Sequence, residues 1–181
     1  MVLQGTIGDE GLFMRVEQLD PEQTERFLVY RSAALSADPD SFRLDVSDDT
    51  IVGIEAWRTR LSTDHVVVVC KDGQWVGVGG LTRLTGAKLA HKGLIWGMHV
   101  MPEERGSGAA KLIMMALIEQ ARGRMRQLQL TVMADNARAI AFYRRFGFER
   151  YGSEPASVLR DGGYADELLM WRLVQDDGGL T

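Results

Sequence analysis

Cysteine and histidine are scarce in this sequence, and their scarcity excludes several kinds of site. Cys70 is the only cysteine, so the chain cannot form an internal disulfide or hold zinc through a cysteine framework. The three histidines, His65, His91 and His99, lack the spacing of a helical metal-binding pair. We therefore expect no metal site, and we expect Cys70 to be a small core residue rather than a nucleophile.

Basic residues and long apolar segments are also limited. The chain has 21 basic against 25 acidic residues and a formal net charge of −4, which argues against binding nucleic acid through a general basic field. No apolar run approaches the roughly 20 residues that span a bilayer. The first residues, Met-Val-Leu-Gln-Gly-Thr, do not have the pattern of a secretory signal. We therefore expect a soluble cytoplasmic protein with no nucleic-acid or membrane partner.

The rest of the composition is typical of an ordinary globular chain. Its 181 residues are 45% hydrophobic and 25% charged, which suffices for one domain with a substantial core. The sequence shows no internal repeat, linker or low-complexity segment. We expect a single domain over residues 1–175, followed by a frayed tail over residues 176–181.

Helical periodicity predicts two helices in the first third of the chain. The first begins at Asp20, where Pro21 and Gln23 complete a capping arrangement, and ends at residues 38–40. Its expected buried stripe is Phe27, Leu28, Arg31, Ala34 and Leu35. The second begins at residues 47–49, although Gly53 within it disfavours a helix. Its expected stripe is Ile54, Trp57, Arg58 and Leu61.

Two more helices are predicted in the second half. A strongly apolar helix over residues 109–122 follows a glycine-rich loop, and we expect it to be largely buried. A shorter helix begins at Asn136, a good capping residue, and ends at Gly147. Its expected stripe is Ala139, Phe142, Tyr143 and Phe146.

Alternating or β-branched segments predict the strands. They lie at residues 12–18, 66–70, 75–81, 93–101 and 127–133, with two more between 148 and 174 around the Asp161-Gly162-Gly163 turn. An Asp-Gly pair at residues 72–73 predicts a tight hairpin. Along 93–101, simple alternation puts the even-numbered residues Leu94 to Val100 on one face and the odd-numbered residues Ile95 to Met101 on the other.

The order of these elements predicts the fold class. Three consecutive strands joined by short turns are expected to be antiparallel, and the later strand–helix–strand unit allows a parallel crossover. The prediction is an α/β (α+β) domain with a mixed central sheet of about six to seven strands and helices on both faces.

The loop between residues 102 and 109 is the first candidate for chemistry. Glycines at 106 and 108 let the backbone bend and let an anion approach it, and the following helix offers amides without internal partners. The loop lacks the Gly-Lys-Ser/Thr of a nucleotide-hydrolysing loop and the Gly-x-Gly-x-x-Gly of a dinucleotide site. The alternative is that its glycines merely end a strand and begin a helix.

Two motifs in sequence order resemble the GCN5-related N-acetyltransferase (GNAT) superfamily. The first is Val100-Met101-Pro102 followed by Arg105-x-x-Gly108-x-Ala110, which is similar to the family's cofactor-binding loop. The second runs from Asn136 through Phe142-Tyr143 to Phe146-Gly147-Phe148. The resemblance covers nearly the whole chain and implies a GNAT-like fold and transfer of the acetyl group of acetyl-CoA directly to a primary amine.

The resemblance also implies roles for particular residues. The strand residues Met98, His99 and Val100 match the segment that holds the pantetheine arm and polarises the acetyl carbonyl. Asn136 matches a residue that touches the cofactor, and Tyr143 matches the usual general acid. The residues that match the pyrophosphate-binding loop are Arg105, Gly106, Ser107, Gly108, Ala109, Ala110 and Lys111.

Each of these roles has a plainer alternative. Arg105 could be a solvated surface charge, Tyr143 a core aromatic, and Asn136 a helix cap with or without a second role. Where some relatives carry a glutamate as general base, this chain has Thr131, which cannot serve. His99 is the nearest titratable alternative, although a single strand histidine is more often packing, and a water chain would also serve.

The acceptor and the assembly are weakly specified. The resemblance places the acceptor site near stretches that contain Phe42, Trp57, Tyr151, Tyr164, Asp166 and Glu167. Such groups suit an amine-bearing small molecule or a peptide or protein N-terminus, and a homodimer is one option for assembly. The alternative function is a non-catalytic acyl-CoA sensor, because a fold and a cofactor loop do not guarantee turnover.

Overall fold

The computed structural model describes residues 14–160 and 162–174. The first two residues of the expected strand at 12–18 and the expected tail at 176–181 lie outside the described residues. Within the described part of the chain, no helix is long and apolar enough to cross a membrane.

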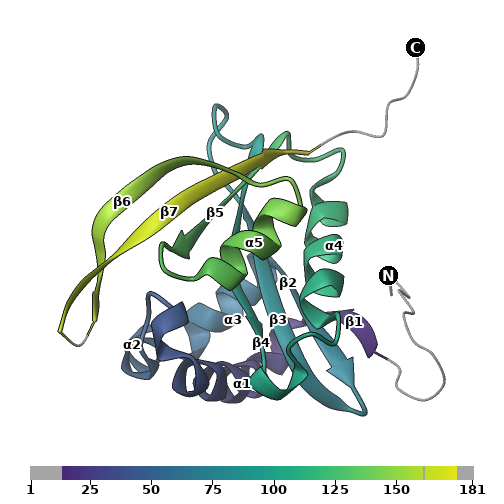
Figure 1. Cartoon of the computed structure of the whole chain (residues 1–181). Helices are drawn as coiled ribbons and strands as arrows, with labels where there is room; N and C mark the ends of the chain where they lie inside the picture. Colours follow the sequence, from purple (N-terminus) through teal and green to yellow (C-terminus); the bar gives the residue numbers. More distant parts are fainter. Residues whose placement is uncertain (1–13, 161, 175–181) are drawn as a thin grey trace. The chain divides into compact units, whose positions relative to one another are not determined.

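The observed elements follow the predicted order, except that one predicted helix is two helices, and the described residues also contain three 3-10 turns (Figure 1). The strands are β1 (Met14–Gln18), β2 (His65–Lys71), β3 (Gln74–Arg83), β4 (Lys92–Val100), β5 (Gln127–Met133), β6 (Glu149–Arg160) and β7 (Gly163–Leu173). The helices are α1 (Thr24–Ala37), α2 (Val46–Val52), α3 (Ile54–Thr63), α4 (Ala109–Ala121) and α5 (Ala137–Arg145). The 3-10 turns are η1 (Pro21–Gln23), η2 (Pro39–Ser41) and η3 (Pro102–Glu104).

The strands form one mixed sheet in the order β1-β2-β3-β4-β5-β7-β6. The pairs β1–β2, β2–β3, β5–β7 and β6–β7 are antiparallel, whereas β4 and β5 run parallel over Lys92–Leu94 and Gln127–Gln129. The parallel pair is joined through α4, as a crossover requires. The predicted mixed sheet of six to seven strands is therefore confirmed.

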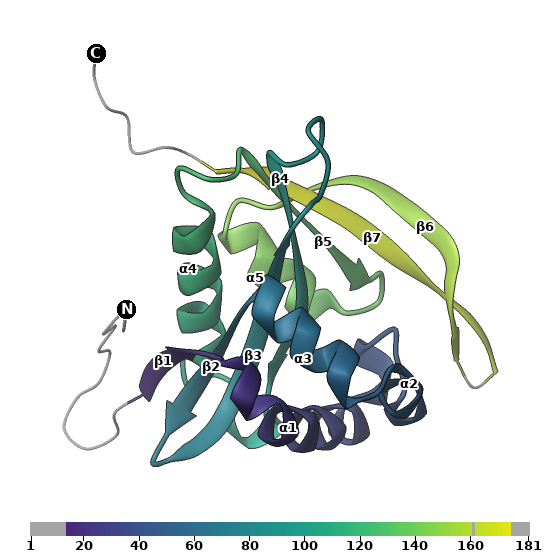
Figure 2. The ribbon, with the colours of Figure 1, turned by 180° about the vertical axis from the view of Figure 1, so that it is seen from behind.

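The chain forms two compact units. Of the described residues, the first unit contains those up to Thr82 together with Ile95–Gln120, and the second contains Arg83–Leu94 and those from Ala121 to Val174. In the first unit, α1 and α3 cover one face of the strands and α4 covers the other (Figure 2). The first unit carries the glycine-rich loop and His99, and the second carries Asn136 and Tyr143.

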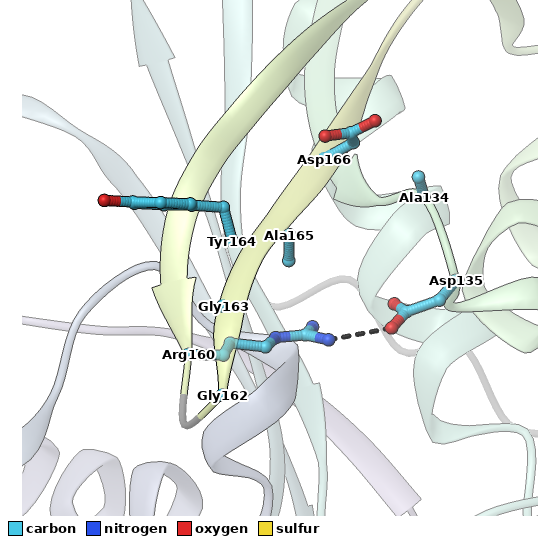
Figure 3. Close-up of a pocket in the computed structure, with 8 residues that line it drawn as sticks. All are labelled: Ala134, Asp135, Arg160, Gly162, Gly163, Tyr164, Ala165 and Asp166. Carbon is cyan, nitrogen blue, oxygen red and sulfur yellow. Dashed lines mark hydrogen bonds and ion pairs between the residues drawn. The ribbon is translucent and has the colours of Figure 1, made fainter.

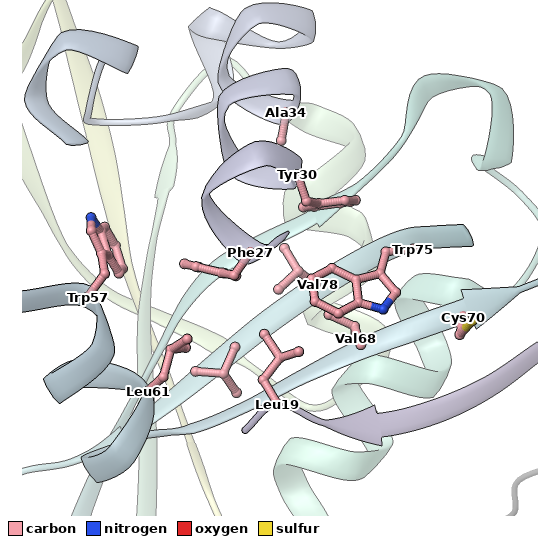
Figure 4. Close-up of a cluster of buried hydrophobic side chains, with 11 residues drawn as sticks. Leu19, Phe27, Tyr30, Ala34, Trp57, Leu61, Val68, Cys70, Trp75 and Val78 are labelled. Atoms are coloured by element: carbon pink, nitrogen blue, oxygen red, sulfur yellow. The ribbon is translucent and has the colours of Figure 1, made fainter. Parts of the chain in front are cut away.

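The core of the first unit lies between its strands and the helices α1 and α3 (Figure 4). Four of its eleven buried residues are aromatic, and the ring centroid of Phe27 lies 5.5 Å from that of Trp57. Cys70 is buried in the same cluster, which confirms the expectation that it is a small core residue. Tyr30 is also buried here, although the predicted stripe of α1 omitted it.

Glycines in β3 let side chains on both faces of the sheet pack closely against this strand. A Cβ on Gly79 would lie 2.6 Å from the Met98 sulfur and would also overlap Ile113 of α4, so position 79 admits no side chain. On the opposite face, a Cβ on Gly80 would overlap the ring of Trp96. These glycines are therefore required for packing rather than for turning the chain.

Strand β4 departs from simple alternation at Gly97. Gly97 has a φ of +62°, which favours glycine and marks a bulge. Trp96 lies against Trp57 on the α3 side, with 6.1 Å between ring centroids, whereas Met98 lies against the α4 side. The predicted shared face of Trp96 and Met98 is therefore wrong, because the bulge reverses the alternation between them.

The second predicted helix is in fact two helices. Gly53, at a φ of +78°, ends α2 and precedes α3, so the residue that disfavoured one long helix is where the helix breaks. The capping side chain of α2 is Asp45 rather than a residue of the predicted 47–49 start. Trp57 and Leu61 are buried as expected, but Arg58 is exposed and pairs with Glu55.

The second unit is built around β5, β7 and a long β6–β7 hairpin (Figure 1). Helix α5 buries Ile140 and Tyr143, whereas Phe142 and Phe146 are only partly buried. Ile140 was missing from the predicted stripe. The end of α5 is tied to β7 by Arg172, whose Nη1 donates to the Phe146 carbonyl at 2.6 Å.

Candidate active site

The loop before α4 is shaped for an anion. Gly106 and Gly108 have φ values of +86° and +96°, and nothing lies within 4 Å of the position a Cβ would take on either residue. The amide of Leu112 is bonded to the Gly108 carbonyl at 3.1 Å, so the hydrogen-bond ladder of α4 begins there. The amides of Ala110 and Lys111 precede that ladder at the positive end of the helix dipole.

Other amides of the loop are already engaged. Those of Arg105 and Ser107 donate to the carbonyls of Pro102 and Glu104 at 3.3 and 3.2 Å, so they stabilise the η3 turn. The amide of Ala109 faces the Ser107 hydroxyl oxygen at 3.4 Å. The part of the loop whose backbone is open to a ligand is therefore its two glycines and the first turn of α4. This open backbone fits a diphosphate.

His99 is buried on β4, with 6% of its surface exposed, and both of its ring nitrogens are engaged. Its Nδ1 lies 3.0 Å from the Tyr30 hydroxyl, and its Nε2 lies 3.2 Å from Oδ2 of Asp38. Because a carboxylate only accepts, Nε2 carries a proton, and in the neutral ring Nδ1 then accepts from Tyr30. The Phe42 ring packs against the imidazole with 5.6 Å between centroids.

Asp38 joins His99 to the loop. Its Oδ2 also accepts a hydrogen bond from the guanidinium of Arg105. Two residues predicted for the site, His99 and Arg105, are thus brought together by a third that the sequence did not single out. Its only signal was an Asp-Pro pair, which we interpreted as the end of a helix.

Tyr30 also belongs to this cluster. Burial raises the pKa of its hydroxyl well above the usual value, and the nearby charge of Glu103 raises it further. The hydroxyl therefore keeps its proton and can donate to His99. Helical spacing alone could have placed Tyr30 on the buried face of α1, one turn from Phe27 and Ala34.

Tyr143 lies in the core of the second unit. Its ring packs edge-on against Phe148 and Phe142, with centroids 6.0 and 5.5 Å apart. Burial raises the pKa of Tyr143 to about 12, so the phenol is protonated throughout the physiological range. The structure thus gives Tyr143 the packing of a core aromatic together with the protonation state that a proton donor needs.

Asn136 caps α5. Its Oδ1 accepts a hydrogen bond from the amide of Ala139 at 3.0 Å, which confirms the predicted cap. Thr131, at the position where some relatives carry a glutamate, lies on β5 opposite Leu169 of β7.

The residues expected near the acceptor have different environments. Trp57 is buried in the core with 2% of its surface exposed, so it cannot line an open site. Tyr151 and Tyr164 are exposed on the β6–β7 hairpin. Glu167 is 2% exposed, and one of its carboxylate oxygens accepts from the Ser157 hydroxyl at 2.7 Å.

An open surface pocket of about 590 Å³ lies within the second unit, at the tip of this hairpin (Figure 3). Its lining residues are Ala134, Asp135, Arg160, Gly162, Gly163, Tyr164, Ala165 and Asp166. Arg160 and Asp135 form an ion pair at 2.7 Å, and Asp166 accepts from the amide of Ala156 at 2.8 Å. Among the described residues, no group of His, Cys, Asp and Glu side chains is arranged to hold a metal ion.

Comparison with known proteins identifies the family. The model of the acetyltransferase (GNAT) family matches residues 20–148, which is more than half of the chain. The chain belongs to the GNAT acetyltransferase family. The GNAT fold predicted from the two sequence motifs is therefore confirmed.

Individual GNAT relatives are similar over much of their length. L-amino acid N-acetyltransferase AaaT of Escherichia coli K12 is 31% identical over 122 residues, which cover 65% of this chain and 75% of that protein. The crystal structure of a GNAT acetyltransferase from Streptococcus pneumoniae superposes with a TM-score of 0.79 at 21% identity, covering 90% of this chain and 99% of that one. The putative acetyltransferase yncA of Salmonella typhimurium, solved with acetyl-CoA, gives 0.74 at 18% identity, covering 93% and 98%.

Proposed function

We propose that this GNAT protein is an acetyl-CoA-dependent N-acetyltransferase that acts on the primary amine of a small molecule, with L-amino acids as the first class to test. The observation that carries the proposal is the open glycine loop at the start of α4, which suits a diphosphate such as that of CoA. The similarity to an L-amino acid N-acetyltransferase supports the choice of acceptor.

The chain's residues have distinct tasks in this proposal. Acetyl-CoA supplies an acetyl thioester, and the loop from Arg105 to Lys111 holds its diphosphate. Backbone groups of Met98, His99 and Val100 orient the pantetheine arm and stabilise the oxyanion that amine attack creates. Tyr143 donates its proton to the departing thiolate and regains one from solvent, and Nδ1 of His99 receives a proton from the acceptor, directly or through water, once the Tyr30 hydroxyl has turned from donating to accepting.

The acceptor needs an environment that tolerates its positive charge before it loses a proton. Asp135 and Asp166 line the pocket of the second unit, and the buried Glu167 adjoins Asp166 on β7. Arg160 lines the same pocket and is paired with Asp135, so Asp166 is the carboxylate there that favours a cationic amine. The free N-terminus of a peptide carries the same group, so short peptides are the second class to test.

The experiment is a thiol-release assay of the purified protein with acetyl-CoA and a panel of amines. The panel contains the L-amino acids, simple diamines and short peptides, and mass spectrometry identifies the acetylated product. The proposal expects thiol release to depend on the acceptor and to be fastest with one α-amine class. Binding of acetyl-CoA without turnover on any acceptor would contradict it and would favour the alternative of an acyl-CoA sensor.

A further inference from the structure

Three segments of the first unit meet at one oxygen atom. Oδ2 of Asp38, which immediately follows α1, is bonded by Nε2 of His99 on β4 and by the guanidinium of Arg105 at the start of the glycine loop. We propose that Asp38 is a positioning residue that couples occupancy of this loop to the protonation of His99. Arg105 leaves Asp38 for a bound diphosphate, and the carboxylate then serves His99 alone. The identity of the anion as the diphosphate of CoA rests on the proposed function.

The charge of His99 depends on Asp38 because the ring is buried. Only 3% of the His99 side chain is exposed, and a buried imidazolium needs a nearby opposite charge. The ring faces the neutral hydroxyl of Tyr30 on α1 and the carboxylate of Asp38 just after α1, and the charge of Glu103 in η3 acts on Tyr30. Arg105 weakens the stabilisation of a charged His99 by these carboxylates, because its positive charge lies at the same Asp38 oxygen.

Arg105 is placed to change partners. It immediately precedes Gly106, where the open backbone begins, and 30% of its side chain is exposed. A guanidinium binds a phosphate through two parallel hydrogen bonds, whereas at Asp38 it shares one oxygen with His99. An incoming diphosphate therefore offers Arg105 a stronger partner within reach of the same loop.

The consequence is that His99 becomes a stronger base when the cofactor binds. While Arg105 is on Asp38, its charge neutralises the carboxylate and disfavours a second positive charge on His99. Once Arg105 has moved, the carboxylate stabilises the imidazolium, and Nδ1 of His99 accepts a proton more readily while the Tyr30 hydroxyl turns to accept a hydrogen bond from it. No covalent bond changes in this exchange. The ring becomes a better proton acceptor when the acetyl donor is in place.

Histidine NMR tests the coupling without measuring turnover. The protein has three histidines, so ring signals labelled with ¹³C and ¹⁵N can be assigned by a His99→Gln variant, with His65 and His91 as internal references. We expect CoA to move the titration midpoint of His99 upward by about one pH unit. The ¹⁵N shifts of the neutral ring should show the proton on Nε2. Calorimetry in the same buffer measures CoA binding.

Two variants separate the coupling from the direct field of the bound anion. In CoA-free Arg105→Gln protein, the His99 midpoint should already be raised, and CoA should raise it little further. In Asp38→Asn protein, the midpoint should fall and lose most of its response to CoA. Arg105→Gln changes a partly exposed side chain, so it keeps the test valid if Asp38→Asn disturbs folding.

The outcomes distinguish this coupling from the proposed function. If CoA binds but the His99 midpoint does not move in the wild type, or if Arg105→Gln leaves the CoA-free midpoint unchanged, the coupling through Asp38 is overturned and the proposed function stands. If CoA does not bind at all, the proposed function fails and the coupling falls with it.

Discussion

At the scale of single residues, Gly108 is a position where the backbone conformation requires glycine. Its φ of +96° is costly for any side chain, and its open surroundings place it where a ligand can reach the backbone. The conformation would strain any replacement, and a branched side chain would also fill the space above the first turn of α4. Both effects act on the anion site directly.

Gly108→Val should therefore abolish acetyl-CoA binding while leaving most of the fold intact. Gly123 is a matched control, because it has a φ of +66°, the same open surroundings and a place outside the loop. Gly123→Val should cost similar stability, about 1–2 kcal/mol, and keep CoA affinity. Calorimetry and thermal unfolding of both variants check this. Binding of acetyl-CoA to Gly108→Val with the affinity of the wild type would show that the glycine loop is not the binding site.

Removing the phenol oxygen of Tyr143 separates its effect on turnover from any effect on cofactor binding. Tyr143→Phe keeps the ring and its packing against Phe148, so stability and CoA affinity should barely change. Turnover should fall by about 10²-fold or less, the modest end of general-acid effects. Because burial raises the pKa of Tyr143 to about 12, the phenol should stay protonated up to that pH. Deprotonation of Tyr143 should therefore not lower turnover at any pH below 10. Unchanged turnover would make Tyr143 a core aromatic only.

At the scale of elements, the packing of β3 and β4 depends on the absence of side chains. The α1/α3 side of the sheet accommodates the Trp96 ring above Gly80, and Trp96 is fixed there by its Nε1, which donates to the Thr82 hydroxyl at 2.8 Å. The guanidinium of Arg60 lies over the indole, 3.7 Å from the ring centroid. The ring is held from several sides and has little room to shift.

Gly80→Ala should accordingly destabilise the protein by about 1–3 kcal/mol, the usual cost of overpacking. Trp96→Phe, a smaller ring, should be destabilising alone and should recover part of the loss when combined with Gly80→Ala. A double-mutant cycle by urea unfolding measures this coupling. Additive effects in the cycle would mean that the methyl group finds space without displacing the indole.

These elements also show what the sequence could predict and what it could not. Repeating patterns predicted the helices and strands, and Asp20, Asn136 and the Asp72-Gly73 pair predicted their boundaries, because those signals are local. The bulge at Gly97 was missed, since a single glycine in a strand does not reveal its own φ. The meeting of Asp38 with His99 and Arg105 was missed as well, since it joins residues 61 and 67 positions apart.

At the scale of the whole molecule, each unit buries one tyrosine that strongly resists ionisation. Burial raises the pKa of Tyr30 in the first unit and of Tyr143 in the second, from an ordinary value of 10.0. Both side chains are neutral in the folded and unfolded chain below that value. Above it the unfolded chain loses these protons first, so alkaline conditions favour unfolding.

The stability of the protein should therefore be insensitive to these tyrosines below pH 10 and should decline as the pH rises further. For Tyr143 the decline would continue up to its folded-state pKa of about 12, a shift of about two units that corresponds to at most about 3 kcal/mol. Urea unfolding between pH 8 and pH 11 measures the slope. Tyr143→Phe and Tyr30→Phe should each flatten it, whereas Tyr164→Phe, on a side chain that is 74% exposed, should not. If the wild type and all three variants lose stability in parallel above pH 10, the loss arises from other groups. If only one of the two variants flattens the curve, that tyrosine alone carries the effect.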